Sequence, residues 1–78
     1  MTLKEAEKLI GHSVTVLIKP IHKIKENPDE ITGTVIEITT WDKKLFLELE
    51  VVYSRGMEVT ISIPINKILE WRDWDDIH

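Results

Sequence analysis

The sequence of 78 residues contains no cysteine, no glutamine and only two asparagines. Without cysteine, neither a disulfide nor a thiolate zinc site can stabilise the fold. No run of about 18 apolar residues occurs, so the sequence holds no candidate for a membrane-spanning helix. The stretch Met1 to Glu5 lacks the apolar core of a signal peptide, so we expect a cytoplasmic protein. The absence of glutamine, with many Ile, Lys and Glu, is typical of thermophile proteins, although an AT-rich genome gives a similar bias.

Charge is unevenly distributed along the chain. Acidic residues outnumber basic ones by 14 to 10, which gives a net charge of -4, and a net acidic chain is a poor general binder of phosphate backbones. Residues 1–25 nevertheless carry five Lys and two Glu, a net of +3, whereas residues 26–78 carry a net of -7. This segregation allows one local basic patch on an acidic protein.

The patterning predicts one small domain over residues 1–78, with a helix over 1–11, strands over 12–71 and an acidic tail over 72–78. Thr2 and Glu5 match the capping box that begins a helix. The apolar residues at helical spacing after it are Leu3, Ala6, Leu9 and Ile10.

After the helix the apolar period changes to two, which predicts five short strands. They cover residues 13–18, 31–40, 45–53, 57–65 and 68–71. Residues 20–30 contain two prolines and are predicted to form a loop, and a slip in phase near Gly33 predicts a bulge or sharp bend. The predicted fold is mainly β: a short N-terminal helix followed by a five-stranded, strongly bent small barrel, because closure removes exposed strand edges.

Five short segments, one at the end of the helix and four in or near the predicted strands, follow one another in an order and spacing that can be compared with known barrels. They are Leu9-Ile10-Gly11, Val14-Thr15-Val16, Ile31-Thr32-Gly33-Thr34-Val35, Leu45-Phe46-Leu47-Glu48-Leu49 and Ile63-Pro64-Ile65-Asn66-Lys67-Ile68. This arrangement resembles the Sm/Lsm/Hfq-type barrel over roughly residues 3–71 and, more loosely, the Src-homology-3-like barrels. The resemblance implies RNA binding. It also implies a homo-oligomer in which strand 57–63 pairs with a neighbouring subunit.

The chain departs from the Sm-like pattern where RNA is held. Family members that bind RNA carry an Asp and an Asn after the second strand and an Arg-Gly pair near the last turn. Here Asp42 is followed by Lys43-Lys44, and the last turn has Pro64-Ile65-Asn66. The resemblance therefore implies the barrel more directly than the RNA site.

One hypothesis is that the chain binds nucleic acid, RNA rather than DNA. Positive side chains would contact phosphates while Trp41 stacks on a base, without reading sequence. The residues of this predicted site are Lys19, His22, Lys23, Lys25, Trp41, Lys43 and Lys44. The alternative for these residues is a set of solvated loops and a tryptophan that covers the core. The family resemblance alone places this hypothesis first.

The second hypothesis is a protein–protein interaction, in which an adaptor, assembly or inhibitor module uses its acidic face. Tryptophan is enriched at binding hot spots, and acidic groups suit a basic partner. The predicted interface residues are Trp74, Asp73, Asp75 and Asp76. Trp74 could equally fold back onto the helix.

Nothing in the sequence indicates catalysis. His12, His22 and His78 stand in no recognisable motif, and no glycine-rich phosphate loop or paired-histidine spacing occurs. The carboxylates of the tail with His78 could hold a divalent ion by ligand type, but a solvated acidic tail is the commoner arrangement. We therefore predict a binding module that is not an enzyme and has neither a cofactor nor a metal site.

Overall fold

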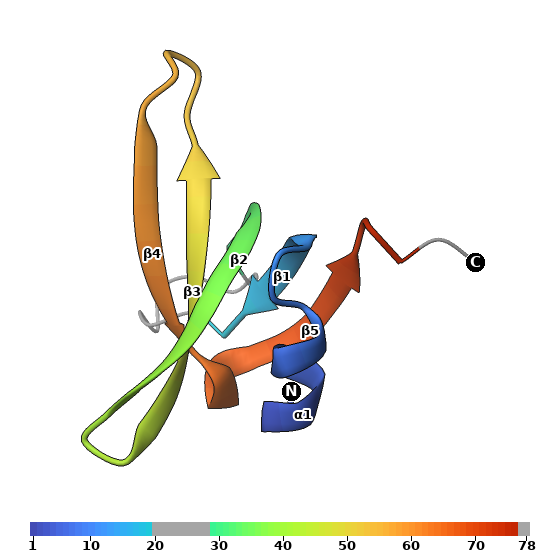
Figure 1. Cartoon of the computed structure of the whole chain (residues 1–78), viewed down its shortest axis with the longest axis vertical. Coiled ribbons are helices and arrows are strands. Elements are labelled where there is room, and N and C mark those ends of the chain that lie inside the picture. Colours follow the sequence, from blue (N-terminus) through green and yellow to red (C-terminus); the bar gives the residue numbers. More distant parts are fainter. Residues whose placement is uncertain (20–28, 77–78) are drawn as a thin grey trace.

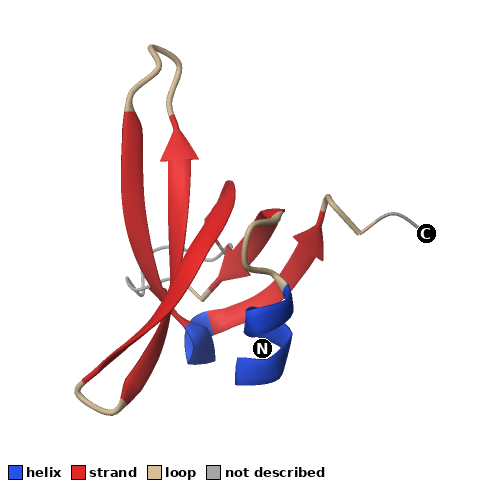
Figure 2. Ribbon diagram, in the orientation of Figure 1, coloured by secondary structure: helices blue, strands red, loops and turns tan. Residues whose placement is uncertain are grey.

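The structure, a computed structural model, describes residues 1–19 and 29–76 as a short helix and one five-stranded antiparallel sheet (Figures 1 and 2). The elements are α1 (Leu3–Lys8), β1 (Ser13–Ile18), β2 (Asp29–Trp41), β3 (Lys44–Val52), β4 (Glu58–Pro64), the 3-10 turn η1 (Ile65–Lys67) and β5 (Ile68–Asp73). The order across the sheet is β4-β3-β2-β1-β5. The prediction of a mainly β fold with an N-terminal helix is confirmed.

Helix α1 begins at the predicted capping box. The Thr2 hydroxyl accepts a hydrogen bond from the Glu5 backbone N–H at 3.2 Å, and Glu5 Oε1 accepts one from the Thr2 N–H at 2.9 Å. The hydrogen bond from the Thr2 backbone N–H favours the ionised carboxylate and lowers the pKa of Glu5. Past the helix, Gly11 adopts a φ of 86° and donates its N–H to the Val35 carbonyl at 2.8 Å. This bond fixes the end of the helical segment against β2, with Ala6 fully buried beneath it.

Strand β2 connects the two halves of the sheet. Its residues 29–34 pair with β1, whereas residues 34–41 pair with β3. The predicted loop over residues 20–30 is therefore wrong at its end, because Asp29 and Glu30 pair with Ile18 and Leu17 of β1. The tail prediction is also wrong at its start, since β5 continues through residues 72 and 73.

The bend in β2 lies where the phase of the apolar residues slips. The register against β3 shifts between Val35 and Glu37, which is the predicted irregularity. A Cβ atom built on Gly33 would lie 2.7 Å from the carbonyl oxygen of Glu50 on β3. A glycine at this position therefore permits the two strands to approach each other as β2 turns.

The sheet is bent but not closed into a barrel, which corrects the predicted closure. Among the described residues, β4 and β5 form the two edges and share no ladder of hydrogen bonds. Pro64 ends β4 without a backbone N–H to donate, and the three-residue turn η1 redirects the chain. The next strand leaves in a new direction and pairs with β1 alone, so the edges do not meet (Figure 1).

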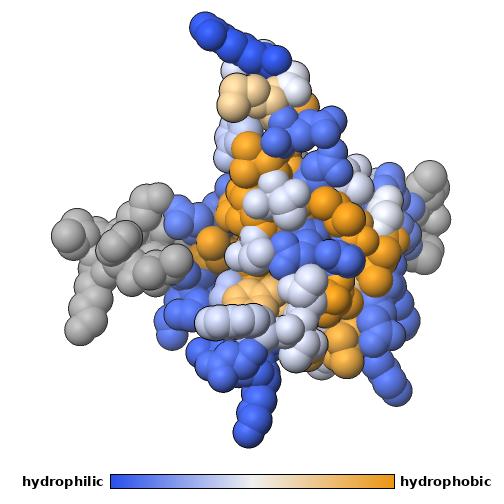
Figure 3. Space-filling model, turned by 60° about the vertical axis from the view of Figure 1, so that its left-hand side comes forward, coloured by the Kyte–Doolittle hydropathy of each residue, from blue (hydrophilic) through white to orange (hydrophobic). Residues whose placement is uncertain are grey.

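The core lies between the concave side of the sheet and α1. Its buried apolar members are Ala6, Leu9, Val14, Val16, Val35, Leu47, Leu49, Ile63, Ile65 and Ile68. The β3–β4 hairpin extends beyond this core, so Tyr53 and Met57, predicted as strand residues, lie outside both strands and are more than half exposed. Figure 3 shows the side of the molecule that lies on the left in Figure 1, where apolar side chains alternate with hydrophilic ones. Within the described part of the chain, the helices are too short or too polar for a membrane crossing.

Candidate functional site

The two-residue turn between β2 and β3 is formed by Asp42 and Lys43, with φ angles of 50° and 62°. Positive φ at both central residues is the geometry of a type I′ hairpin, whose twist matches that of the flanking strands. The turn places Trp41 directly opposite Lys44 in the register. Local backbone geometry thus brings two lysines and a tryptophan to one end of the sheet, as the nucleic-acid hypothesis requires.

The lysines of this turn lie beside the last turn of the chain. Lys43 and Lys44 line a hollow of about 260 Å³ together with Asn66 of η1 and with Met1. Lys19, also predicted for the nucleic-acid site, is exposed and donates its backbone N–H to the Lys67 carbonyl at 2.9 Å. Basic residues from three separate segments are therefore arranged around η1. His22, Lys23 and Lys25, the remaining members of the predicted site, lie outside the described residues.

Trp41 lines a different hollow from the one that holds the lysines. Its side chain is 74% exposed and borders a hollow of about 230 Å³ whose other lining residues are Thr39, Phe46, Glu48 and Ser62. The aromatic surface and the lysines predicted to act together are thus divided between two hollows. Trp41 shares its hollow with the carboxylate of Glu48.

Glu48 is the charged residue buried most deeply in the described part of the chain, with 9% of its surface exposed. Thr39 on β2 donates its hydroxyl to Oε1 at 2.8 Å. Ser62 on β4 donates to Oε1 at 2.8 Å and to Oε2 at 2.6 Å. Hydrogen bonding from both neighbouring strands explains how a carboxylate can lie in the middle of a sheet.

Glu48 lies on the convex side of the sheet, opposite the core. Residues directly across an antiparallel ladder share a face, and Glu48 lies across from Glu37 on β2 and from Ser62 on β4. Glu50 follows two positions along β3, and Glu58 lies across from Val52, two positions further on. We call this convex surface of β2, β3 and β4, which carries Glu37, Glu48, Glu50 and Glu58, the outer face.

Like charges on the outer face perturb one another. The negative charge of Glu58 raises the pKa of Glu50 above its usual range, and a hydrogen bond between the two side chains acts in the same direction. Two carboxylates held this close disfavour each other's ionised forms. A cation bound between them would relieve that repulsion.

The C-terminal residues predicted as a protein interface make contacts within the chain. Asp73 accepts a hydrogen bond from His12 Nδ1 at 2.8 Å, and Asp75 accepts one from the Ser13 backbone N–H at 2.7 Å. Trp74 donates its indole N–H to the Thr15 hydroxyl at 2.8 Å. The segment thus folds back onto β1, whereas the alternative considered from sequence was the helix.

The contact between His12 and Asp73 changes the pKa of both side chains. The hydrogen bond to Asp73 raises the pKa of His12, and the negative charge of Asp73 adds to the effect. Partial burial would raise the pKa of Asp73, but the hydrogen bonds from His12 and from the backbone N–H of Asp75 outweigh it and lower that pKa. The pair is a structural link between the residue that precedes β1 and the end of β5.

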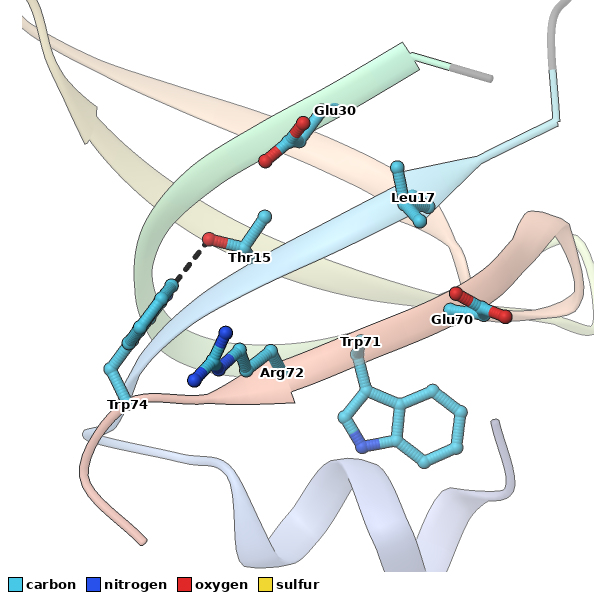
Figure 4. Close-up of a pocket in the computed structure, with 7 residues that line it drawn as sticks. All are labelled: Thr15, Leu17, Glu30, Glu70, Trp71, Arg72 and Trp74. Atoms are coloured by element: carbon cyan, nitrogen blue, oxygen red, sulfur yellow. Dashed lines mark hydrogen bonds between the residues drawn. The ribbon is translucent and has the colours of Figure 1, made fainter. Parts of the chain in front are cut away.

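A further hollow lies over β1 and β5, next to this segment, and has a volume of about 310 Å³ (Figure 4). The guanidinium carbon of Arg72 lies 4.2 Å from the centre of the Trp74 ring, which is a cation–π contact. The other lining residues are Thr15, Leu17, Glu30, Glu70 and Trp71. Two carboxylates and one guanidinium line it, and the guanidinium of Arg72 is already stacked on Trp74.

The tail does not form a metal site in the described residues. Neither Asp73, Asp75 and Asp76 nor any other described histidines and carboxylates form a group of three placed to hold an ion. His78, the fourth residue considered from sequence, lies outside the described part.

The site predicted from the sequence included Trp41 and the lysines. It did not include Glu48, Thr39 and Ser62, which the structure brings together as one group. The signal was a glutamate in the middle of an apolar strand, with hydroxyl residues in the strands on either side. Only the register of the three strands places these side chains together.

A scan for known protein families, a search of curated proteins and a search of solved structures each return no match. The choice between the two hypotheses therefore rests on the geometry of the surfaces.

Proposed function

We propose that this chain is a non-catalytic binding module whose outer face docks a basic segment of another protein. The observation that carries the proposal is the buried Glu48 carboxylate, hydrogen-bonded by Thr39 and Ser62 beside the exposed Trp41. An ordered acid next to an exposed tryptophan suits an interface, because tryptophan is enriched among the residues that contribute most of the binding energy.

The charges around this hollow favour a positive partner. Glu37, Glu50 and Glu58 share the outer face with Glu48, and the one basic strand residue near them is Lys44, at the end of β3 among the described residues. Such a surface attracts basic segments over a Debye length, increases their association rate and repels phosphate backbones. The net charge of -4 acts in the same direction.

The docking surface proposed here is the outer face and differs from the C-terminal tail, which was predicted from the sequence. The side chains of Asp73, Trp74 and Asp75 already hold the C-terminal segment on β1. A partner that used the hydrogen-bonding atoms of these side chains would have to compete with these contacts.

The test is binding of a short fluorescent peptide of alternating arginine and serine, with a glutamine–serine peptide as the uncharged comparison. We expect the arginine peptide alone to bind, and to bind more weakly as salt is added. Replacing Glu37, Glu50 and Glu58 together by Gln should weaken binding by roughly tenfold at low salt.

A matched triple variant checks that the location of the charge matters. It replaces the exposed Glu7, Glu30 and Glu70 by Gln and changes the net charge equally. These residues lie on α1, on the end of β2 that pairs with β1, and on β5, whereas the outer-face carboxylates lie where β2, β3 and β4 pair. We expect it to bind nearly as tightly as the unmodified chain. Equal losses in the two triple variants would show a non-specific charge effect and contradict the proposal.

A second candidate function is binding of single-stranded nucleic acid around η1. The observation in its favour is the hollow that brings Lys43 and Lys44 together with Asn66, while Lys19 is joined to Lys67 on the other side of the turn. Lysines at such a site would hold phosphates while an amide contacts a base. Replacing Lys43 and Lys44 by Ala should then abolish binding of a short single-stranded RNA at low salt. RNA binding that persists in this variant would exclude the site.

Self-association through β4 is a further part of this proposal. In the described sheet the strand pairs with β3 alone, and its exposed Val59 lies two residues from the exposed Met57 at the hairpin tip. An unpaired edge with apolar side chains can extend its sheet with a second copy. Light scattering of the full chain tests this. A single-copy mass at high concentration, unchanged when Val59 is replaced by Lys, would refute it.

A further inference from the structure

Thr39, Trp41, Phe46, Glu48 and Ser62 form one compact group on the outer face, which we call the Trp41 hollow. Thr39 lies directly across from Phe46, and Glu48 lies across from Ser62. Trp41 lies across from Lys44 and is therefore the diagonal neighbour of Phe46, within reach of an aromatic side chain. Three adjacent strands thus supply two aromatic rings and three oxygen-bearing side chains to a space of about 230 Å³.

The oxygen-bearing groups of the hollow offer acceptors but no free donors. An ionised carboxylate can only accept hydrogen bonds, so the hydrogens between it and its two partners belong to the Thr39 and Ser62 hydroxyls. Each hydroxyl has one hydrogen and two lone pairs, and its hydrogen is committed to Glu48. What remains free is a set of lone pairs on Glu48 Oε2 and on the two hydroxyl oxygens.

A cluster of oxygens that only accepts hydrogen bonds favours a ligand group that donates them. Arginine and lysine side chains are donors without acceptors, whereas phosphates and carboxylates are acceptors, and nucleobases carry both. The buried negative charge of Glu48 strengthens this selection, because charge–charge attraction increases as water is excluded. Within the described residues Glu48 has hydroxyl partners but no cationic one.

The aromatic rings favour a guanidinium over an ammonium group. A planar guanidinium stacks on the face of an indole while its N–H groups point in the plane, and arginine is the more frequent partner in such contacts. The chain already contains one example, since Arg72 lies 4.2 Å over the ring of Trp74. Trp41 has no arginine over its ring in the described structure and is 74% exposed.

We propose that the Trp41 hollow is a subsite for a single arginine side chain of the partner protein, stacked on Trp41 and hydrogen-bonded to Glu48. The subsite deepens the proposed function and rests on it, because the arginine comes from the basic segment that the outer face docks. The remaining outer-face carboxylates attract that segment, whereas the hollow fixes the position of one residue within it.

The test uses small capped amino acids, so that it does not depend on a peptide binding to the whole face. Capped arginine, capped lysine and capped citrulline, which has arginine's shape without its charge, are titrated into isotopically labelled protein. The readout is the NMR signal of each tryptophan indole N–H. We expect capped arginine to shift the Trp41 signal, lysine to shift it less and citrulline to leave it unchanged. An equal response to citrulline would overturn the proposal, as would shifts confined to Trp74.

Two variants locate the contacts. Trp41→Ala should weaken binding of the arginine peptide by roughly three- to thirtyfold, as expected for loss of a cation–π contact. Glu48→Gln should weaken it by at least about tenfold, because the retained amide cannot replace the charge. Trp74→Ala and Glu70→Gln, which lie outside the outer face, are the matched controls and should each change binding by less than about threefold. The dispersion of the NMR spectrum verifies that each variant is folded.

The outcomes separate the subsite from the proposed function. Unchanged peptide binding in Trp41→Ala and Glu48→Gln, with loss in the Glu37, Glu50 and Glu58 triple variant, would refute the subsite and leave docking to the outer face intact. Capped arginine that binds at Trp41 while the arginine peptide fails to bind would support the subsite and refute the docking. A single-stranded RNA that shifts the Trp41 signal and binds more tightly to Glu48→Gln would overturn the subsite in favour of nucleic acid.

Discussion

Replacing Gly33 by Ala tests whether close contact between β2 and β3 determines the bend of the sheet. The φ angle of Gly33 is not in the left-handed region, so backbone strain does not oppose the change. The added Cβ would instead lie 2.7 Å from the Glu50 carbonyl oxygen and 3.1 Å from Val51 Cγ2. A backbone oxygen in a paired strand cannot rotate away, so one strand must shift at the junction where the Thr34–Glu50 pair joins them.

The magnitude follows from two opposing effects. A strand alanine without contacts would be more stable than glycine by about 0.5–1 kcal/mol, because glycine loses more conformational entropy on folding. Overpacking of this kind typically costs about 1–3 kcal/mol. We therefore expect a net loss of about 1–2 kcal/mol in the free energy of unfolding, which for a domain of this size lowers Tm by roughly 4–16 °C.

Thermal and urea unfolding followed by circular dichroism measure this loss. Gly33→Ser is the companion variant, because the conflict concerns Cβ itself and the serine should be destabilised by a similar amount. Gly11→Ala is the comparison, since its Cβ would meet no atom within 4 Å and only its φ of 86° is unfavourable. A Gly33→Ala protein as stable as the unmodified chain would refute the account of the bend.

Three further predictions concern the core, the His12 link and the buried acid. Leu47→Ala removes a fully buried side chain and should cost about 2–5 kcal/mol by urea unfolding; a loss below about 1 kcal/mol would contradict the core assignment. Because its hydrogen bond to Asp73 raises the pKa of His12, the link should stabilise the fold fully below the ordinary value of 6.5 and lose this effect as pH rises through the raised folded pKa. The stability difference between the unmodified chain and His12→Gln should shrink over that pH range, and a difference independent of pH would argue against the link. Ser62→Ala leaves the Glu48 carboxylate with one hydroxyl donor and should cost about 1–3 kcal/mol; no change in Tm would mean that water replaces the hydroxyl.

The local elements of this fold were predictable from the sequence because their causes are local. The capping box of Thr2 and Glu5 begins the helix, and β1 has the predicted bounds because its alternation is regular and the strand ends two residues before Pro20. The bend near Gly33 was predicted from the slip in apolar phase. Each of these signals lies within a few residues and depends on backbone geometry or side-chain periodicity.

Two features could not be predicted from local sequence signals: whether the sheet closes into a barrel, and which side chains come together in the candidate site. Whether β4 and β5 meet depends on the direction in which η1 sends the chain, and no periodicity encodes that direction. The separation of Trp41 from Lys43 also required the structure, because the two residues line different hollows whose other walls come from segments distant in the sequence.

The sequence by itself determined the class of the fold, the helix start, most of the strands and the acidic character, because composition and local period encode them. Only the tertiary structure decided that Glu48 lies buried among hydroxyls beside Trp41. These side chains come from three strands, and a shift of one residue in the register would move any of them to the opposite face. The candidate site is therefore a property of strand pairing.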